Sequence, residues 1–299
     1  MTDQQRLAQV RARLELPMLR RAAGLLEGRH RSIFKGHGQD FDDLSLYNPG
    51  DDIGDIDWKS SARAGIPIIR RFVRQSNLTT VLAVDTGSEM GATAASGAET
   101  KGEVAVFLAS IIAYVSRDRG DRVALVAGDS GRIQQRPPRA STQDLEILLE
   151  QVSRMFDVSA RPRDLERVLR RVEDAFHRRA LVVLVTDESQ PHPDLLPVLR
   201  RLRMRHTILI IAVGDANPFS PEIATTDTPI QDVAGTLVLP PFLRGRTTLA
   251  QAAGQAAAQA RHRAFETARA AKADMMITAG SDNALADLVT LLGRYRYVS

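Results

Sequence analysis

Several residue types and motifs are scarce or missing in this sequence. None of the 299 residues is cysteine, which excludes disulfide bonds, thiol catalysis and cysteine-ligated zinc. The N-terminus lacks the apolar core of a signal peptide, and no apolar run approaches the roughly 18 to 20 residues that cross a bilayer. We therefore expect a cytoplasmic protein with no membrane span.

Common catalytic and nucleotide-binding motifs are also missing. No predicted strand is followed by a phosphate loop or by Gly-x-Gly-x-x-Gly, and the Gly-x-Ser-x-Gly nucleophile elbow does not occur. The six histidines are scattered, and none has metal-ligand spacing such as His-Glu-x-x-His. The sequence shows no assembled catalytic constellation, so we expect the protein not to be an enzyme.

The chain does have a large apolar fraction and a small basic excess. Hydrophobic residues make up 43%, the formal net charge is +4 and the pI is about 9.7. This composition is ample for a large core. Residues 1–27 form a first segment whose apolar spacing predicts helices over 3–27, interrupted at Pro17. Its arginine-rich face indicates either a docked amphipathic helix pair or a basic arm for a phosphate-rich partner.

Acidic and basic residues are segregated between Gly36 and Arg74, which we call the charged segment. The only tryptophan, Trp58, lies where the sign of the charge changes. Tyr47 begins a turn sequence that continues as Asn-Pro-Gly. The aspartates are Asp40, Asp42, Asp43, Asp51, Asp52, Asp55 and Asp57, and the cations that follow are Lys59, Arg63, Arg70, Arg71 and Arg74.

The charged segment allows two interpretations. In the first, its acidic and basic arms pair with each other as a surface hairpin. In the second, it is a recognition element in which a strand from Gly54 places Ile56 and Trp58 on one face and the adjacent charged residues on the other. The second interpretation gives a partner-binding set of Tyr47, Asp51, Asp52, Asp55, Asp57, Trp58 and Arg63.

From residue 79 onward, short apolar strands alternate with helices. The clearest strands are 81–84, followed by Asp85, and 180–186, followed by Asp187; such runs are typical of buried parallel strands. Further strands are expected at 122–129, 207–215 and 275–279, with 131–136 as a hairpin partner, and helices at about 102–117, 142–156, 163–177, 194–205, 247–272 and 283–294. Residues 216–246 are proline-rich and expected to be irregular.

This alternation predicts an α/β fold with a doubly wound, mainly parallel sheet and helices on both faces. We expect three parts: the N-terminal helical segment 1–27, a segment 28–78 that carries the charged stretch, and an α/β domain over 79–299.

Four of the predicted strands end in aspartate, namely Asp85, Asp129, Asp187 and Asp215. Ligands of open parallel sheets bind beyond the carboxyl ends of the strands, near the switch in strand order. Several carboxylates at one edge indicate a hard cation such as magnesium. The alternative is that these aspartates cap helices or start turns, which we favour for Asp129 and Asp215.

Several motifs together resemble one bacterial family, the domain of unknown function fifty-eight. They are Gly28-Arg-His-Arg-Ser-Ile-Phe-Lys-Gly-His-Gly38, Asp40-Phe41, Tyr47-x-Pro-Gly-Asp-Asp52, Ile56-Asp-Trp58, Ser61-Ala-Arg63 and the strand ending in Asp85. The resemblance covers about Gly28 to the C-terminus. It implies a von Willebrand factor A-like fold and no established enzymatic activity. It also implies an adaptor or chaperone-like component that works with a MoxR-type AAA+ ATPase.

Related factor A domains bind partners through a metal-ion-dependent adhesion site with Asp-x-Ser-x-Ser after the first strand. Here Gly87 and Glu89 stand at the two serine positions, and the Ser88 hydroxyl is one place off. The resemblance therefore implies a degenerate site for Mg²⁺ or Mn²⁺, with Asp85, Glu89, Asp187 and Thr142 as candidate ligands. The charged segment departs from the family pattern as well, because basic residues are common there at the positions of Ser45 and Gly54.

Three functions follow from these observations. The first is a non-enzymatic interaction or adaptor module for a MoxR-type AAA+ ATPase and a protein client. The second is a metal-dependent hydrolase that uses the strand-end carboxylates, although histidine and lysine partners for two-metal chemistry are missing. The third is nucleic-acid binding by arginine-rich helices, which the acidic cluster and the 5% aromatic content argue against.

Overall fold

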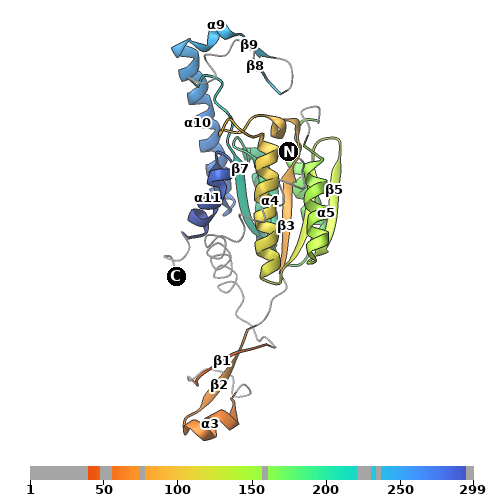
Figure 1. The fold of residues 1–299 in the computed structure, drawn as a ribbon, viewed down its shortest axis with the longest axis vertical. Coiled ribbons are helices and arrows are strands. Elements are labelled where there is room, and N and C mark those ends of the chain that lie inside the picture. Colours follow the sequence, from red (N-terminus) through yellow and green to blue (C-terminus); the bar gives the residue numbers. More distant parts are fainter. Residues whose placement is uncertain are drawn as a thin grey trace. The chain divides into compact units, whose positions relative to one another are not determined.

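The computed structural model describes residues 40–47, 56–73, 78–156, 161–220, 230–233 and 237–293. The helices expected over 3–27 lie outside these ranges. The described residues form two compact units, one within 28–77 and one that begins at Leu78. We call them the small unit and the sheet unit (Figure 1).

The sheet unit is built on a six-stranded sheet with the order β10-β7-β6-β3-β4-β5. All neighbouring pairs are parallel except β4 and β5, which are antiparallel. The strands are β3 (Thr79–Asp85), β4 (Arg122–Gly128), β5 (Ile133–Arg139), β6 (Ala180–Asp187), β7 (Thr207–Val213) and β10 (Asp274–Thr278). The predicted α/β fold, with its mainly parallel sheet, is confirmed.

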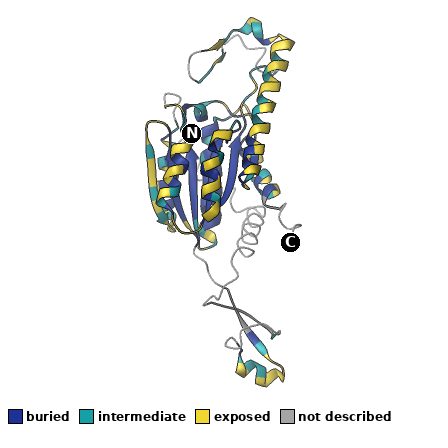
Figure 2. Ribbon diagram, turned by 180° about the vertical axis from the view of Figure 1, so that it is seen from behind, coloured by how far each residue is buried: buried dark blue, intermediate teal, exposed yellow. Residues whose placement is uncertain are grey.

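Helices cover both faces of this sheet, which explains why its central strands are apolar on both sides (Figure 2). One apolar cluster joins the sheet to α4 (Lys101–Asp118), α5 (Thr142–Ser153) and α11 (Ser281–Gly293). The other joins it to α6 (Leu165–Ala175), α7 (Leu196–Arg205) and α10 (Thr247–Ala270). A short 3₁₀ turn, η2 (Ser88–Gly91), follows β3, and a second one, η3 (Pro193–Leu195), precedes α7.

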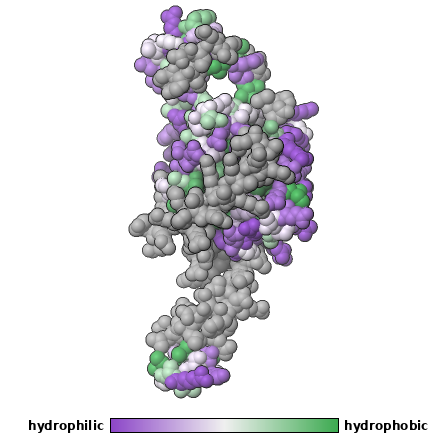
Figure 3. Space-filling view, viewed as in Figure 1, coloured by the Kyte–Doolittle hydropathy of each residue, from purple (hydrophilic) through white to green (hydrophobic). Residues whose placement is uncertain are grey.

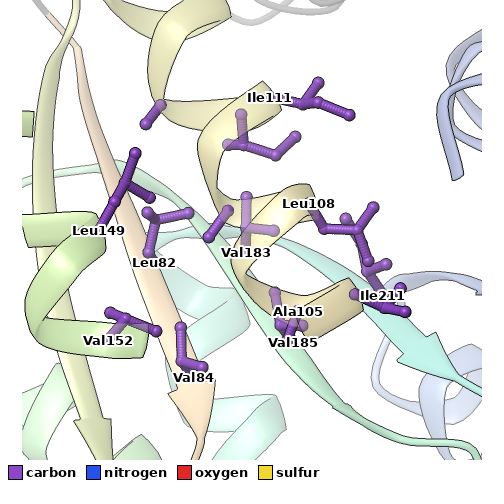
Figure 4. Packing of buried hydrophobic residues seen from close by; sticks show 14 of the residues in the cluster. Leu82, Val84, Ala105, Leu108, Ile111, Leu149, Val152, Val183, Val185 and Ile211 are labelled. Carbon is purple, nitrogen blue, oxygen red and sulfur yellow. The ribbon is translucent and has the colours of Figure 1, made fainter. Parts of the chain in front are cut away.

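Helix α4 lies at the centre of the first cluster (Figure 4). A capping box starts it, because the Thr100 side chain accepts from the Glu103 backbone and the Glu103 side chain accepts from the Thr100 backbone. Buried side chains of α4 then pack on β3, β6, β7 and α5. Figure 4 labels Ala105, Leu108 and Ile111 of α4 together with their neighbours Leu82, Val84, Leu149, Val152, Val183, Val185 and Ile211. This packing fixes where the first turn of α4 lies relative to the strand ends.

The strand order reverses between β3 and β6. The chain builds β3, β4 and β5 outward in one direction, and then β6, β7 and β10 outward in the other. In such sheets the crevice at the carboxyl ends of the two central strands is where ligands bind. Asp85 ends β3 and Asp187 ends β6, so these two aspartates flank that crevice.

The segment expected to be irregular contains short elements among its described residues. A two-stranded antiparallel pair joins β8 (Ile230–Gln231) to β9 (Val238–Leu239), and one turn of helix, α9 (Pro241–Arg244), follows. Helix α10 then begins at Thr247.

The small unit has a two-stranded antiparallel sheet, β1 (Asp40–Leu46) with β2 (Ile68–Val73), and one helix, α3 (Trp58–Ala64). In the backbone register, Asp43 lies opposite Arg71. The part of the acidic arm in β1 therefore pairs along the backbone with the part of the basic arm in β2.

The expectation that a strand from Gly54 continues through Trp58 is wrong at Trp58, while Gly54 and Asp55 lie outside the described residues. Ile56 makes only an isolated bridge to Ile69, and α3 starts at Trp58. The reason is local: the Asp57 carboxylate accepts from the backbone N–H groups of Lys59 and Ser60, both at 3.0 Å, and such a cap favours a helix start over a strand.

None of the helices in the described part of the chain combines the length and the apolar character needed to cross a bilayer.

Leu108 tests how far the fold depends on the packing of α4. Its side chain is fully buried in the first cluster, so Leu108→Ala should lower the free energy of unfolding by about 2 to 5 kcal/mol. Urea denaturation followed by circular dichroism measures this. Met204→Ala, at a side chain that is 86% exposed, is the control and should leave the midpoint unchanged. Equal effects of the two variants would contradict this account of the core.

Candidate functional site

Charged side chains from distant parts of the chain meet at the carboxyl ends of β3, β6 and β7. We call this group the strand-end site. Its members are Asp85, Glu89, Lys101, Arg163, Asp187 and Asp215.

Lys101 is the central cation of the strand-end site. It is the first residue of α4, and its Nζ lies 2.5 Å from Oδ2 of Asp187 and also contacts Oδ1 of Asp215. The Lys101 side chain is only 2% exposed. Burial lowers the pKa of Lys101, but the two carboxylates outweigh this and hold the pKa above its usual value. The buried ammonium therefore stays charged.

Asp187 has both carboxylate oxygens occupied. While Oδ2 accepts from Lys101, Oδ1 accepts from the Ser189 hydroxyl at 2.5 Å, the Ser189 backbone N–H at 2.9 Å and Nη1 of Arg163 at 3.3 Å. Burial by itself raises the pKa of Asp187, but the Lys101 charge and these hydrogen bonds reverse the effect and hold the pKa well below its usual value. Asp187 is therefore an ionised carboxylate held between two cations.

Arg163 is the second cation of the strand-end site. Its Nε lies 3.1 Å from Oε1 of Glu89, and its backbone N–H donates to Oε2 of Glu89 at 3.2 Å. The guanidinium therefore bridges Glu89, on η2, and Asp187, at the end of β6. The segment just before α6 is fixed to the crevice by these contacts.

Asp85 is fully buried, and its hydrogen bonds come from a backbone N–H group and a hydroxyl rather than from a cation. Its Oδ1 accepts from the Gly87 backbone at 3.0 Å, and its Oδ2 accepts from the Thr186 hydroxyl at 2.9 Å. Burial raises the pKa of Asp85 to about 6. Burial raises the pKa of Asp215 to about 6 as well, so Asp187 is the strand-end aspartate whose pKa is lowered.

The backbone around Gly87 leaves no room for a side chain. A Cβ at this position would lie 2.6 Å from both the Cα and the backbone N of Arg163. A serine at the position of Gly87 would require the Arg163 segment to move. The glycine at position 87 is therefore coupled to the close approach of Arg163.

The residues present fit a divalent cation poorly. Asp85, Glu89 and Asp187 do come together at one edge of the sheet, but Lys101 and Arg163 already take the acceptor oxygens that a metal would need. Within the described ranges, no group of three or more histidine, aspartate or glutamate side chains is arranged to hold a metal ion.

Thr142 does not lie with the other candidate ligands. It accepts at 2.9 Å from Arg117, near the end of α4, whereas Lys101 begins that helix. Sixteen residues of helix separate the two points by about 24 Å. Strand β5 runs antiparallel to β4, so the chain is back at the amino-terminal ends of the parallel strands when α5 begins. The prediction that places Thr142 in the site is therefore wrong.

Three members of the strand-end site were not among the expected site residues. The sequence favours a cap or turn role for Asp215 and assigns no site role to Lys101 or Arg163. A lysine at the start of an otherwise apolar helix was the available signal, because cations are disfavoured at helix N-termini. Asp129 does act locally, since its carboxylate accepts from the backbone of Gly131 and Arg132.

The structure describes four of the seven residues of the predicted partner-binding set. Tyr47 is half-buried and its backbone donates to Pro67 at 3.0 Å. Asp57 caps α3, while Trp58 and Arg63 are exposed on that helix. The other three, Asp51, Asp52 and Asp55, lie outside the described residues.

The fold and the strand-end site define a class: an α/β domain with a doubly wound, mainly parallel sheet, whose crevice at the carboxyl ends of the central strands is held by internal ion pairs. The particular family follows from the sequence. Residues 43–222 match the family model described as "Protein of unknown function DUF58", and the chain belongs to that family.

Relatives and solved structures extend this comparison. Uncharacterized proteins of Mycobacterium tuberculosis and Mycobacterium bovis are 28% identical to this chain over 260 residues, which cover 85% of the chain and 80% of each relative. An aerotolerance-related membrane protein from Bacteroides fragilis is similar with a TM-score of 0.46 and 14% identity, over 73% of this chain and 99% of that one. A von Willebrand factor type A protein from Catenulispora acidiphila has a TM-score of 0.41 and 16% identity, over 75% and 43%.

Gly87→Ser tests the steric argument at the crevice. We expect the free energy of unfolding to fall by about 1 to 3 kcal/mol, because the added side chain collides with the Arg163 backbone. The matched control is Gly254→Ser, since a Cβ at Gly254 on α10 meets nothing within 4 Å. Thermal unfolding of both variants measures the difference. A Gly87→Ser protein as stable as the parent would show that the Arg163 segment moves freely.

Lys101→Met tests the buried ion pair. Removing one partner leaves Asp187 buried with less compensation, so we expect a loss of about 3 to 5 kcal/mol in the free energy of unfolding. Arg154→Met breaks an exposed pair with Glu150 and should change little. Chemical denaturation of the two variants and the parent makes the comparison, and similar losses in both would contradict the assignment of Lys101.

Proposed function

We propose that this protein is a non-enzymatic interaction module that works with a MoxR-type AAA+ ATPase in the assembly or maturation of a client protein. The observation that carries the proposal is the exposure of Trp58. The chain's only tryptophan is 69% exposed, on a helix none of whose residues is buried. Tryptophan is among the residues that most often dominate the energetics of protein interfaces.

The surroundings of Trp58 support a protein partner. Ile66 is 48% exposed just beyond the end of α3, and Lys59 and Arg63 are exposed on the helix itself. An aromatic anchor beside an apolar residue and cations is the composition of an interface centre with a polar rim. Figure 3 shows hydrophobic and hydrophilic residues side by side on the described surface of the small unit.

The framework of α3 presents the tryptophan in a fixed way. The Asp57 cap defines where the helix starts, and Gly65, with φ of 70°, ends it in the left-handed region. The Ser61 hydroxyl accepts from the Ile68 backbone at 2.8 Å, which ties the helix to β2. A preorganised anchor loses little conformational entropy on binding.

The strand-end site supports the non-enzymatic part of the proposal. Its carboxylates are held by Lys101 and Arg163, and two-metal hydrolysis needs such groups to be open to ions about 4 Å apart. We therefore place the hydrolase alternative second.

Trp58→Ala tests the proposal in a capture experiment. Immobilised parent protein should retain a MoxR-type ATPase of the same genome in at least one of the apo, ADP and ATP-analogue states, and Trp58→Ala should retain at least about tenfold less, which is the loss of an interface hot spot. The unfolding midpoints of the parent and Trp58→Ala should match, because the Trp58 side chain is largely exposed in the free protein.

The control for this experiment is Met204→Ala, which removes a side chain of the sheet unit that is 86% exposed and should keep full capture. Capture of nothing by the parent in all three nucleotide states would refute the ATPase partnership. Full capture by Trp58→Ala would move the interface away from α3.

A further inference from the structure

Lys101 occupies a position that is unfavourable for a lysine on two separate grounds. It is the first residue of α4, where the unpaired N–H groups of the helix repel a cation. Its ammonium is also withdrawn from water, with 2% of the side chain exposed, and removing a charge from water is costly. Packing alone would favour an apolar or small residue here, so the ammonium itself is what the position requires.

The groups around the ammonium are those that would hold a hard cation. Oδ2 of Asp187 and Oδ1 of Asp215 both contact Nζ, and they come from the ends of two neighbouring parallel strands, β6 and β7. Carboxylate oxygens are the ligands that Mg²⁺ and Mn²⁺ prefer. The crevice beyond β3 and β6 is where this type of sheet binds ligands.

The site is also closed from the side of β3. Arg163 takes the second oxygen of Asp187 and one oxygen of Glu89, and its backbone fills the space that a side chain at position 87 would need. Three departures from a metal site therefore occur together: an ammonium between Asp187 and Asp215, a guanidinium on Asp187 and Glu89, and a glycine at position 87.

We propose that the ammonium of Lys101 is a tethered cation that takes the place of a divalent metal ion in the strand-end site. The strand-end site then keeps its structure at any concentration of Mg²⁺ or Mn²⁺. Binding of a partner at the carboxyl ends of these strands would not depend on a metal ion. Removal of the ammonium uncovers a cation site formed by Asp187 and Asp215. This inference concerns the sheet unit and stands apart from the role of Trp58.

Lys101→Ala tests the proposal, because it removes the ammonium and leaves its space. In metal-free buffer the variant should melt below the parent. Addition of ~10 mM Mn²⁺ should raise its melting temperature by about 3 °C or more, whereas the parent should shift by less than about 1 °C. Calorimetry with Mn²⁺ should show one site in Lys101→Ala and none in the parent.

Three controls separate a replaced metal from an ordinary ion pair. Lys101→Met also removes the charge but fills the space, so its Mn²⁺ response should be much smaller than that of Lys101→Ala. The double variant Lys101→Ala/Asp187→Ala should lose the response, because a ligand is gone. Lys59→Ala makes the same substitution at an exposed lysine and should behave as the parent does.

Two results would overturn the proposal. The first is Mn²⁺ binding by the parent that disappears in Asp187→Ala, since the metal would then bind despite the lysine. The second is a Lys101→Ala protein that Mn²⁺ does not stabilise, including one that stays unfolded at every Mn²⁺ concentration, because a true substitute for a cation must be replaceable by one.

Discussion

The contact between the Lys101 ammonium and the Asp187 carboxylate is the constraint on which the strand-end site depends. It joins residues 86 positions apart and connects the first turn of α4 to the end of β6. Asp215 adds the loop after β7, and Arg163 adds the segment before α6. Four stretches of chain are thereby fixed at the carboxyl ends of the central strands, and these ion pairs give the site its defined shape.

This network contributes more to specificity than to stability. A buried ion pair recovers little beyond its desolvation cost, whereas breaking it is expensive. The folding free energy comes instead from the two apolar clusters on the faces of the sheet. The two units thus differ in character. The sheet unit buries its apolar residues in two clusters on the faces of the sheet, with the ion pairs at the ends of the strands. The small unit exposes a tryptophan on a helix with no buried residue.

Local pattern was a good guide to the sheet unit. Continuous apolar runs marked β3, β4, β6 and β7, since strands covered on both faces must be apolar throughout. Helix periodicity and caps placed α4, α5, α6 and α10 within a few residues. Local pattern failed near Trp58, where alternation suggested a strand. There Asp57 caps the start of a helix. The sequence signal for this helix is one capping side chain and not a hydrophobic periodicity.

Local sequence patterns predict the order and type of the main elements, and they predict that Asp85, Glu89 and Asp187 meet at the carboxyl ends of the strands. The packing of the helices on the sheet places Lys101 and Arg163 among these carboxylates. It places Thr142 beside Arg117, near the opposite ends of the strands. The physical reason is the range of the interactions. Hydrophobic periodicity and helix caps act over a few residues and leave a trace in the local sequence. The pairing of a lysine with an aspartate 86 positions away is decided by how helices and strands pack, so the local sequence around the lysine does not identify its partner.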